Sequence, residues 1–129
     1  MSAQSTAITA LTCWRENRSG GYAGMQSVAN VIVNRSRHSG ASLYTECTRR
    51  LQFSSITAHN DPQLALWPIE GDPEWIQALQ IAAAADAGEL KDITLGSTNY
   101  YAASLDPVPS WAAEMTFTVQ IAGQKFYRA

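Results

Sequence analysis

The chain has few of the residues that several common activities require. It contains two cysteines, Cys13 and Cys47, and two histidines, His38 and His59. It has no CxxC pair, and neither histidine has a supporting cluster, so we expect no metal site and no cofactor. Nine basic residues against eleven acidic ones give a net charge of −2. This balance argues against nucleic acid as a partner, because phosphate binding usually needs a basic face.

Long apolar runs are also missing. No stretch approaches the roughly 20 apolar residues that span a bilayer, so we expect no membrane insertion. The N-terminus lacks the basic and apolar regions of a secretory signal, which predicts synthesis in the cytoplasm without a signal peptide. Apolar residues still make up 46% of the 129 residues, enough for a folded core. The length predicts one domain over residues 1–129, which we expect to be a monomer.

The two cysteines leave two interpretations open. Free cysteine is usually buried, so the favoured interpretation of Cys13 and Cys47 is a pair of buried thiols. The alternative is one disulfide, if the two side chains meet and the compartment is oxidising.

Helical spacing of apolar residues predicts helices over about residues 5–17 and 23–38, and a third from Pro73 to Gly88, with Asp72 as its N-cap. Between them, residues 39–71 are irregular, with helical turns near 45–51 and loops at 52–55 and 59–62. The third helix has an apolar stripe of Trp75, Ile76, Leu79, Ala82 and Ala83. Near the C-terminus, alternation predicts a half-buried strand of Met115, Phe117, Val119 and Ile121, with a turn at Gly123 and a short second strand at 125–127.

The first predicted helix has two faces. One is an apolar stripe of Ala7, Ile8, Leu11, Trp14 and the stem of Arg15, and the other consists of Ser5, Thr9, Thr12 and Glu16. Spacing alone favours a solvated second face that ends in an ordinary surface glutamate. The second predicted helix is apolar over most of its surface, so it should be largely buried. Its amides Asn30 and Asn34 then need partners, which we expect to be backbone groups of neighbouring loops.

Glu16 is nevertheless the candidate catalytic residue. It closes the first helix, a glycine-rich turn at 19–21 follows, and the apolar second helix packs behind. Apolar surroundings favour the neutral form of a carboxyl group, and a general acid must hold its proton near the working pH.

These residues, in order, resemble the SleB-type cell wall hydrolase family, which includes spore-cortex-lytic enzymes and phage endolysin-like relatives. The family pattern begins with a glutamate in a segment like Gly-Glu-Ala-Arg-Gly, and a helix ending Val-Ala-Asn-Val, two apolar residues and Asn-Arg follows. Residues 15–20 and 24–35 match these parts. The later matches are Gln52-Phe53-Ser54, Gly96-Ser97-Thr98-Asn99-Tyr100-Tyr101, Pro109-Ser110-Trp111 and Phe126-Tyr127-Arg128.

The chain departs from the family pattern at several positions. Arg15 replaces the glycine before the glutamate, and Asn17 replaces the alanine after it. Asn99 stands where the family has a histidine, and the segment 121–126 lacks the histidine of the family's closing motif.

The resemblance implies a lysozyme-like α+β fold, mainly helical with a small C-terminal β-hairpin or sheet. It also implies cleavage of the β-1,4 bond between N-acetylmuramic acid and N-acetylglucosamine in peptidoglycan, whose glycan strands are the expected partner. Glu16 would be the general acid and base. Ser54, Tyr100 and Tyr101 are expected to orient the sugar, and Phe53 and Asn99 are further substrate-binding candidates.

Several alternatives stay open at this point. Lytic transglycosylase chemistry is favoured, because a single carboxylate suffices when the substrate's acetamido group assists. Hydrolysis by water, as in a muramidase, is the second possibility, and an inactive wall-binding or virion module is the third. A protease or amidase lacks a Cys/His or zinc constellation. We expect the protein to act on the wall after release, either as a phage-type endolysin or as a fragment of a larger enzyme.

Overall fold

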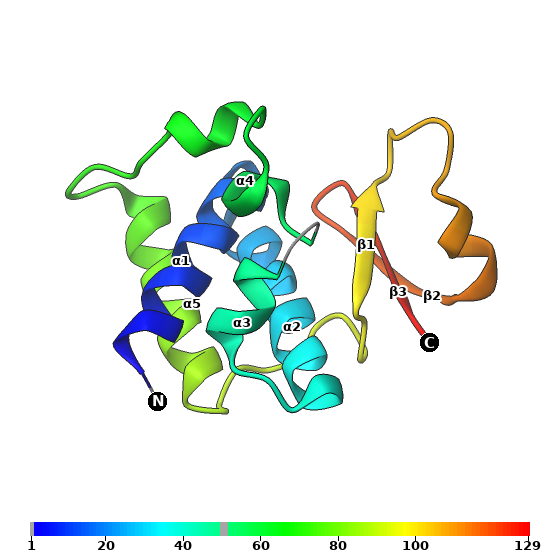
Figure 1. Cartoon of the computed structure of the whole chain (residues 1–129), viewed down its shortest axis with the longest axis horizontal. Coiled ribbons are helices and arrows are strands. Elements are labelled where there is room, and N and C mark those ends of the chain that lie inside the picture. The colour runs from blue at the N-terminus through cyan, green and yellow to red at the C-terminus, as the bar shows by residue number, and fades with distance from the viewer. Residues whose placement is uncertain (1, 50–51) are drawn as a thin grey trace.

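The computed structural model describes residues 2–49 and 52–129. It places the α-helices on one side of the molecule and a small sheet on the other (Figure 1). The expected α+β class, mainly helical with a small C-terminal sheet, is confirmed. The α-helices are α1 Ala3–Asn17, α2 Gly21–Ser39, α3 Leu43–Thr48, α4 Ser54–Thr57 and α5 Pro73–Asp86. The 3-10 helices are η1 Arg18–Gly20, η2 Pro62–Ala65 and η3 Ser110–Glu114, and the strands are β1 Asn99–Ala102, β2 Thr116–Ile121 and β3 Gln124–Arg128.

Helix α1 begins slightly earlier than the apolar spacing predicts. Ser2 caps it, and the Ser2 hydroxyl accepts a hydrogen bond from the Ser5 amide at 3.0 Å. A serine at this position satisfies one of the unpaired amides at a helix start, which explains the earlier boundary. Ala7, which belongs to the predicted apolar stripe, is exposed.

The opposite face of α1 is buried, so the expectation of a solvated face is wrong. Helix α3 lies against it: the Tyr44 amide donates to the Ser5 hydroxyl at 3.3 Å, and the Thr9 hydroxyl meets the Cys47 sulfur at 3.8 Å. Small side chains let the two helices approach closely, and their hydroxyls find partners within the contact. At the far end of this face, Glu16 is partly exposed.

The amides of α2 connect it to the segment that precedes the sheet, as predicted. The Asn30 side chain donates to the Lys91 carbonyl at 2.9 Å and accepts from the Ile93 amide at 3.0 Å. The Asn34 side chain donates to the Ser97 carbonyl at 2.9 Å. These buried amides therefore hold residues 91–97 against α2, which is a structural role and not contact with a substrate.

Helix α5 has the predicted ends but only part of the predicted face, in which Ala82 is buried and Trp75 packs against the core. Asp72 caps it by accepting from the Glu74 and Trp75 amides, and Gly88 adopts a φ of 74° just beyond it. Ile76 and Leu79, however, point outward. The buried residues are Ala78, Ile81, Ala82 and Ala85. A surface made mostly of alanine lets α5 lie close to α1, and this close contact decides which face is covered.

The region between α2 and α5 contains more helix than the sequence predicts. Helix α3 confirms the predicted helical turns in part, and residues 50–51 of that prediction lie outside the described residues. Helix α4 corrects the loop expected at 52–55. The turn predicted at 59–62 is present: Asp61 caps η2 by accepting from the Gln63 amide at 2.8 Å.

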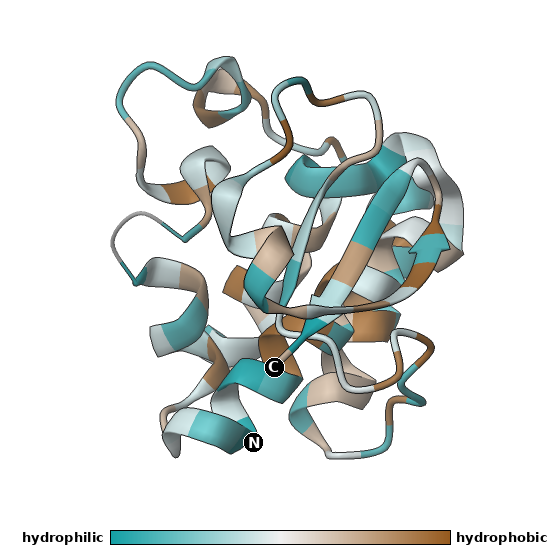
Figure 2. Cartoon of the chain, turned by 90° about the vertical axis from the view of Figure 1, so that its right-hand side faces the viewer, coloured by the Kyte–Doolittle hydropathy of each residue, from teal (hydrophilic) through white to brown (hydrophobic). Residues whose placement is uncertain are grey.

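Among the described residues the strands form an antiparallel sheet in the order β1-β3-β2. The predicted hairpin of β2 and β3 is confirmed, with Gly123 at a φ of 79° in its turn. A register shift between Phe117 and Val119 breaks the alternation, so Phe117 is 49% exposed. The sequence did not predict β1, whose Tyr100 pairs with Phe126 of β3. Figure 2 turns the sheet toward the viewer and shows hydrophilic and hydrophobic segments following one another along its strands.

Cys13 and Cys47 both lie in the helical core as free thiols. Burial raises the pKa of Cys13, and raises the pKa of Cys47 to about 11. The interpretation as a pair of buried thiols is therefore confirmed. Thiols with raised pKa values are poor nucleophiles, because the thiolate is the reactive form.

In the described part of the chain, no helix combines the length and the apolar character that crossing a membrane requires.

Candidate active site

Glu16 lies in the last turn of α1 and is partly buried. Its side chain lines a cavity of about 220 Å³, at the junction of α1, η1 and η2. The other lining residues are Arg15, Asn17, Arg18, Ser19 and Gln63. Glu16 thus lies at a partly open hollow and not on an open convex surface.

Tyr100 reaches this carboxyl group from the sheet. Its hydroxyl donates a hydrogen bond to Oε1 of Glu16 at 2.6 Å, across 84 residues of sequence. The Tyr100 ring packs against Phe126, with 5.4 Å between the ring centroids. Burial, and then the neighbouring Glu16 carboxyl, raise the pKa of Tyr100 well above its ordinary value. Tyr100 therefore keeps its proton and remains a hydrogen-bond donor to Glu16.

Glycines allow the end of α1 to approach its neighbours. A Cβ atom added at Gly24 would lie 2.8 Å from the Asn17 side-chain nitrogen, and one at Gly20 would lie 2.8 Å from both Asn17 and Ala122. The Asn17 amide also donates to the Gln124 side chain at 3.4 Å. The glycine-rich turn is thus a packing requirement, because it brings the β2–β3 turn up to the residue that follows Glu16.

Arg15 holds the loop that covers the end of α1. Its guanidinium donates to the carbonyls of Leu66 at 3.2 Å, Ser55 at 2.9 Å and Leu64 at 3.4 Å. The same group lies 4.5 Å from the ring centroid of Trp67. Burial lowers the pKa of Arg15, and the negative charge of Asp61 opposes that effect. A guanidinium has a fixed fork of donors and is well suited to such a multidentate role.

Arg18 adds a second tether to the same loop. It donates to the Gln63 side chain at 2.9 Å and to the Trp14 carbonyl at 3.1 Å, and it lies 4.0 Å from the Trp14 ring centroid. Glu16 therefore sits between two arginines whose donors hold the cavity wall.

Two aspartates of the neighbouring loop are engaged elsewhere. Asp61 accepts from the Ser54 hydroxyl at 2.6 Å and caps η2. Asp72 caps α5 and accepts from the Trp14 indole at 3.3 Å. Within the described residues, Glu16 is the one carboxylate that lines the cavity.

Of the predicted substrate-binding residues, only Tyr100 is brought to Glu16 by a hydrogen bond within the described chain. Phe53 is 1% exposed and lies in the core below the Arg35 guanidinium, so direct contact with a sugar is not available to it. The prediction for Phe53 is therefore corrected to a packing role, because its ring completes the helical core.

Tyr101 likewise turns away from the cavity. Neighbouring residues of a strand point to opposite faces of the sheet, and Tyr101 is the neighbour of Tyr100. It is 7% exposed, and its ring stacks on Tyr127 with 5.6 Å between centroids. Its hydroxyl lies 3.1 Å from that of Tyr127. The sugar-orienting role expected of Tyr101 is thus replaced by packing on the outer face of the sheet.

The remaining two candidates, Ser54 and Asn99, lie away from the cavity of Glu16. Ser54 is exposed, and its hydroxyl is bound to Asp61. Asn99 is partly buried and accepts from the Thr98 hydroxyl at 2.9 Å. It lines a separate cavity of about 370 Å³ beside His38 and not the cavity of Glu16.

Sequence reasoning did not assign the roles of Arg15, Arg18 and Gln63. The signal available was the replacement of the family's glycine by Arg15, directly before the candidate acid. Its contacts span from 40 to 51 residues along the chain, so local patterns do not reveal them.

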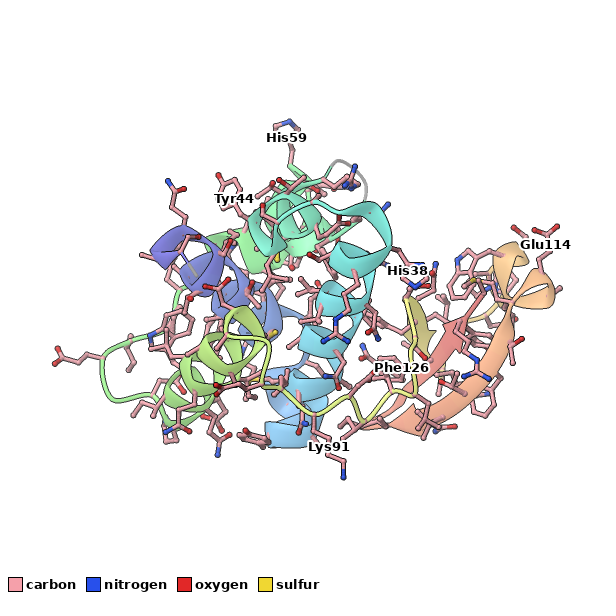
Figure 3. The ribbon with its side chains drawn as sticks, turned by 90° about the horizontal axis from the view of Figure 1, so that it is seen from below. His38, Tyr44, His59, Lys91, Glu114 and Phe126 are labelled. Atoms are coloured by element: carbon pink, nitrogen blue, oxygen red, sulfur yellow. The ribbon has the colours of Figure 1, made fainter. Side chains whose placement is uncertain are left out.

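The histidines form no site with the buried thiols. Both are exposed, and Figure 3 shows His59 pointing away from the body of the protein while His38 lies beside the sheet. Among residues 2–49 and 52–129, no group of three or more His, Cys, Asp or Glu side chains could hold a metal ion.

Comparisons with known proteins agree with this architecture. The Cell Wall Hydrolase family matches residues 19–127, a stretch that begins after Glu16. The catalytic domain of the germination-specific lytic transglycosylase SleB from Bacillus anthracis has a similar structure, with a TM-score of 0.74 at 21% sequence identity, over 99% of this chain and 97% of that one. This likeness confirms the lysozyme-like fold. A search of curated proteins found no match.

Proposed function

The chain belongs to the cell wall hydrolase family, and on that premise we propose that it cleaves the glycan strands of peptidoglycan with Glu16 as general acid and base. The bond proposed is the β-1,4 link between N-acetylmuramic acid and N-acetylglucosamine. One observation carries the assignment: Glu16 lines a cavity, and Tyr100 donates a 2.6 Å hydrogen bond to its carboxyl group.

The proposed reaction begins with proton transfer. Glu16 gives its proton to the glycosidic oxygen as the bond between that oxygen and C1 of the muramic residue breaks. The acetamido group of the same residue supports the positive charge that develops at C1. Most glycosidases supply a second carboxylate for this purpose. The engagement of Asp61 and Asp72 in helix caps favours assistance by the substrate.

In the second step, Glu16 takes the proton of the muramic 6-hydroxyl while that oxygen bonds to C1. The product is a 1,6-anhydro end, no water is consumed, and Glu16 regains its proton. This sequence is lytic transglycosylase chemistry. If water attacked C1 in place of the 6-hydroxyl, the outcome would be hydrolysis, as in a muramidase.

Tyr100 has a positioning role in this proposal. Its hydrogen bond restricts the Glu16 side chain, and two hydrogen-bonded arginines line the same cavity. A catalytic group must be held close to its productive geometry, because small misplacements cost large factors in rate. Ser54, the exposed first residue of α4, remains a candidate for orienting the sugar. We further propose that the protein acts on the wall after release from the cell that makes it.

Substitution of Glu16 by Gln tests the assignment directly. We expect release of soluble fragments from purified peptidoglycan to fall by about 10²–10⁴-fold while the thermal unfolding curve stays close to that of the parent. Glu114→Gln is a matched control, since Figure 3 shows Glu114 at the far end of the sheet side. A folded Glu16→Gln variant that digests peptidoglycan normally would disprove the assignment.

Mass spectrometry of the digest then separates the chemistries. An anhydro product is one water lighter than the hydrolysed product. A parent protein that binds peptidoglycan and yields neither product would be an inactive wall-binding module.

A further inference from the structure

The loop beside Glu16 exposes apolar side chains although its backbone is firmly held. Leu66 is 41% exposed, Trp67 is 66% exposed and Ile69 is 75% exposed. Arg15 binds the carbonyls of Leu64, Leu66 and Ser55. Large apolar side chains gathered at a surface mark a place of contact with another molecule. In this loop they sit on an immobilised frame next to the proposed active site.

Trp67 differs from its neighbours because one face of its ring is already covered. The Arg15 guanidinium lies 4.5 Å from the ring centroid. Three backbone carbonyls fix that guanidinium, so it supports the indole from below in a defined orientation. With 66% of the residue exposed, the ring has a free flat surface. It thus combines a large rigid contact area with little conformational freedom to lose on binding.

The position of the ring relates it to the proposed reaction. Arg15 lines the cavity of Glu16, and its guanidinium also lies against the Trp67 ring. One side chain therefore contacts both the cavity and this indole. A glycan strand held at Glu16 extends beyond it on both sides. One face of a pyranose ring presents a flat set of C–H groups, which is the chemical complement of an indole face.

We propose that Trp67 is a stacking platform for a sugar ring of the glycan strand, in a subsite beside the Glu16 cavity. This proposal rests on the proposed function, and it names the substrate feature that the surface recognises. Binding energy gained at a sugar that does not react supports the chemistry at the one that does.

The test measures binding in the Glu16→Gln background, where cleavage does not interfere. Binding of the protein to purified peptidoglycan and to stem-free glycan strands of graded length is followed by sedimentation. We expect Trp67→Ala to weaken binding of long strands by roughly tenfold. Trp67→Phe retains a ring and should stay within about threefold of the parent. The loss should shrink for strands too short to reach from Glu16 to Trp67.

Ile69→Ser is the matched control, because Ile69 is at least as exposed and lies in the same loop. We expect it to bind within about twofold of the parent. Unchanged binding by Trp67→Ala would overturn the proposal. Equal losses from Trp67→Ala and Ile69→Ser, at every strand length, would also overturn it and would point to an apolar surface for a protein or a lipid. If the parent cleaves nothing but Trp67→Ala still loses binding, the proposed reaction fails and the platform stands.

Discussion

The helical side and the sheet side of this protein are built differently. The helices enclose a shared core with many side chains at 0% exposure. These include Ala10, Cys13, Met25, Val28, Ala29, Ile32, Ile81 and Ala82. In the three described strands, by contrast, only Tyr101 and Phe126 are buried. The sheet therefore depends less on apolar burial than the helices do.

Hydrogen bonds hold the sheet side in place where apolar burial is small. The segment between α5 and β1 is held by Asn30 and Asn34 of α2, and Arg35 donates to the Thr98 carbonyl at 2.6 Å. Tyr100 adds the link to Glu16. The proposed active site therefore lies at the junction of the apolar helical core and the hydrogen-bonded sheet side. The core supplies stability, and the network sets the position of the groups around Glu16.

The largest expected effect is on the helical side. Ile32→Ala removes most of a side chain that is 0% exposed in the core. We expect the free energy of unfolding to fall by about 2–5 kcal/mol, because a cavity adds to the loss of apolar burial. Denaturant titration followed by circular dichroism measures it.

Ile76→Ala serves as the control, since the same side chain is 47% exposed on α5. Its loss of unfolding free energy should be clearly smaller, near the range seen for surface substitutions. Equal costs at the two positions would contradict the contrast between the core and the helix surface.

An intermediate effect is expected at Asp92, which joins α2 to the segment before β1. It accepts from the Asn34 side chain at 3.0 Å and from the Thr94 amide at 2.8 Å. Burial raises the pKa of Asp92, but hydrogen bonds from Thr94, Asn34 and Gly96 outweigh burial and lower it. Asp92→Asn should reduce the free energy of unfolding by about 1–3 kcal/mol at neutral pH.

The pH dependence follows from the lowered pKa. The contribution of Asp92 is complete above its unfolded pKa and is lost as the pH falls through the folded one. The gap in unfolding free energy between parent and Asp92→Asn should therefore begin to narrow below about pH 4 and close only below the lowered pKa of the folded state. Unfolding titrations at several pH values measure this gap, with Glu89→Gln as an exposed control. A gap that is constant from neutral to acid pH would show that the carboxylate charge is not what stabilises the segment.

The smallest expected effect on stability is at the direct link between the two sides. Tyr100→Phe keeps the ring that packs on Phe126 and removes the donor to Glu16. We expect a loss of about 1 kcal/mol in the free energy of unfolding. Release of fragments from peptidoglycan should fall by about tenfold or more, because the position of Glu16 is less restricted.

Tyr44→Phe, on the exposed side of α3, is the control for removal of a tyrosine hydroxyl. It should leave fragment release unchanged. If Tyr100→Phe also left it unchanged, the positioning role of Tyr100 would be disproved.

Much of the fold could be predicted because the signals are local. Asp72, Pro73 and Gly88 mark the ends of α5, and Gly123 marks the turn between β2 and β3. Asn30 and Asn34 could be assigned to structure because an amide on a mostly apolar helix needs a partner. Strand β1 was missed because it is short and its hydrogen-bond partners lie in β3, which is distant from it in the sequence.

Burial of helix faces was harder to predict. The threonine-bearing face of α1 and the alanine face of α5 are covered, whereas Ile76 and Leu79 are exposed. Small residues allow close helix contact, so the fit between helices can outweigh the hydropathy of single side chains.

Sequence alone determined most helix ends and the hairpin, because capping, turn chemistry and apolar periodicity act over a few residues. The resemblance of its motifs to a known family added the class of fold and the one carboxylate worth testing. Tertiary structure alone decided that Tyr100 meets Glu16, that Arg15 fixes the loop around it, and that Phe53 and Tyr101 serve packing. The reason is physical: the hydrogen bonds of Arg15 and Tyr100 join residues 40 to 84 positions apart, and their geometry exists only after the core has brought those segments together.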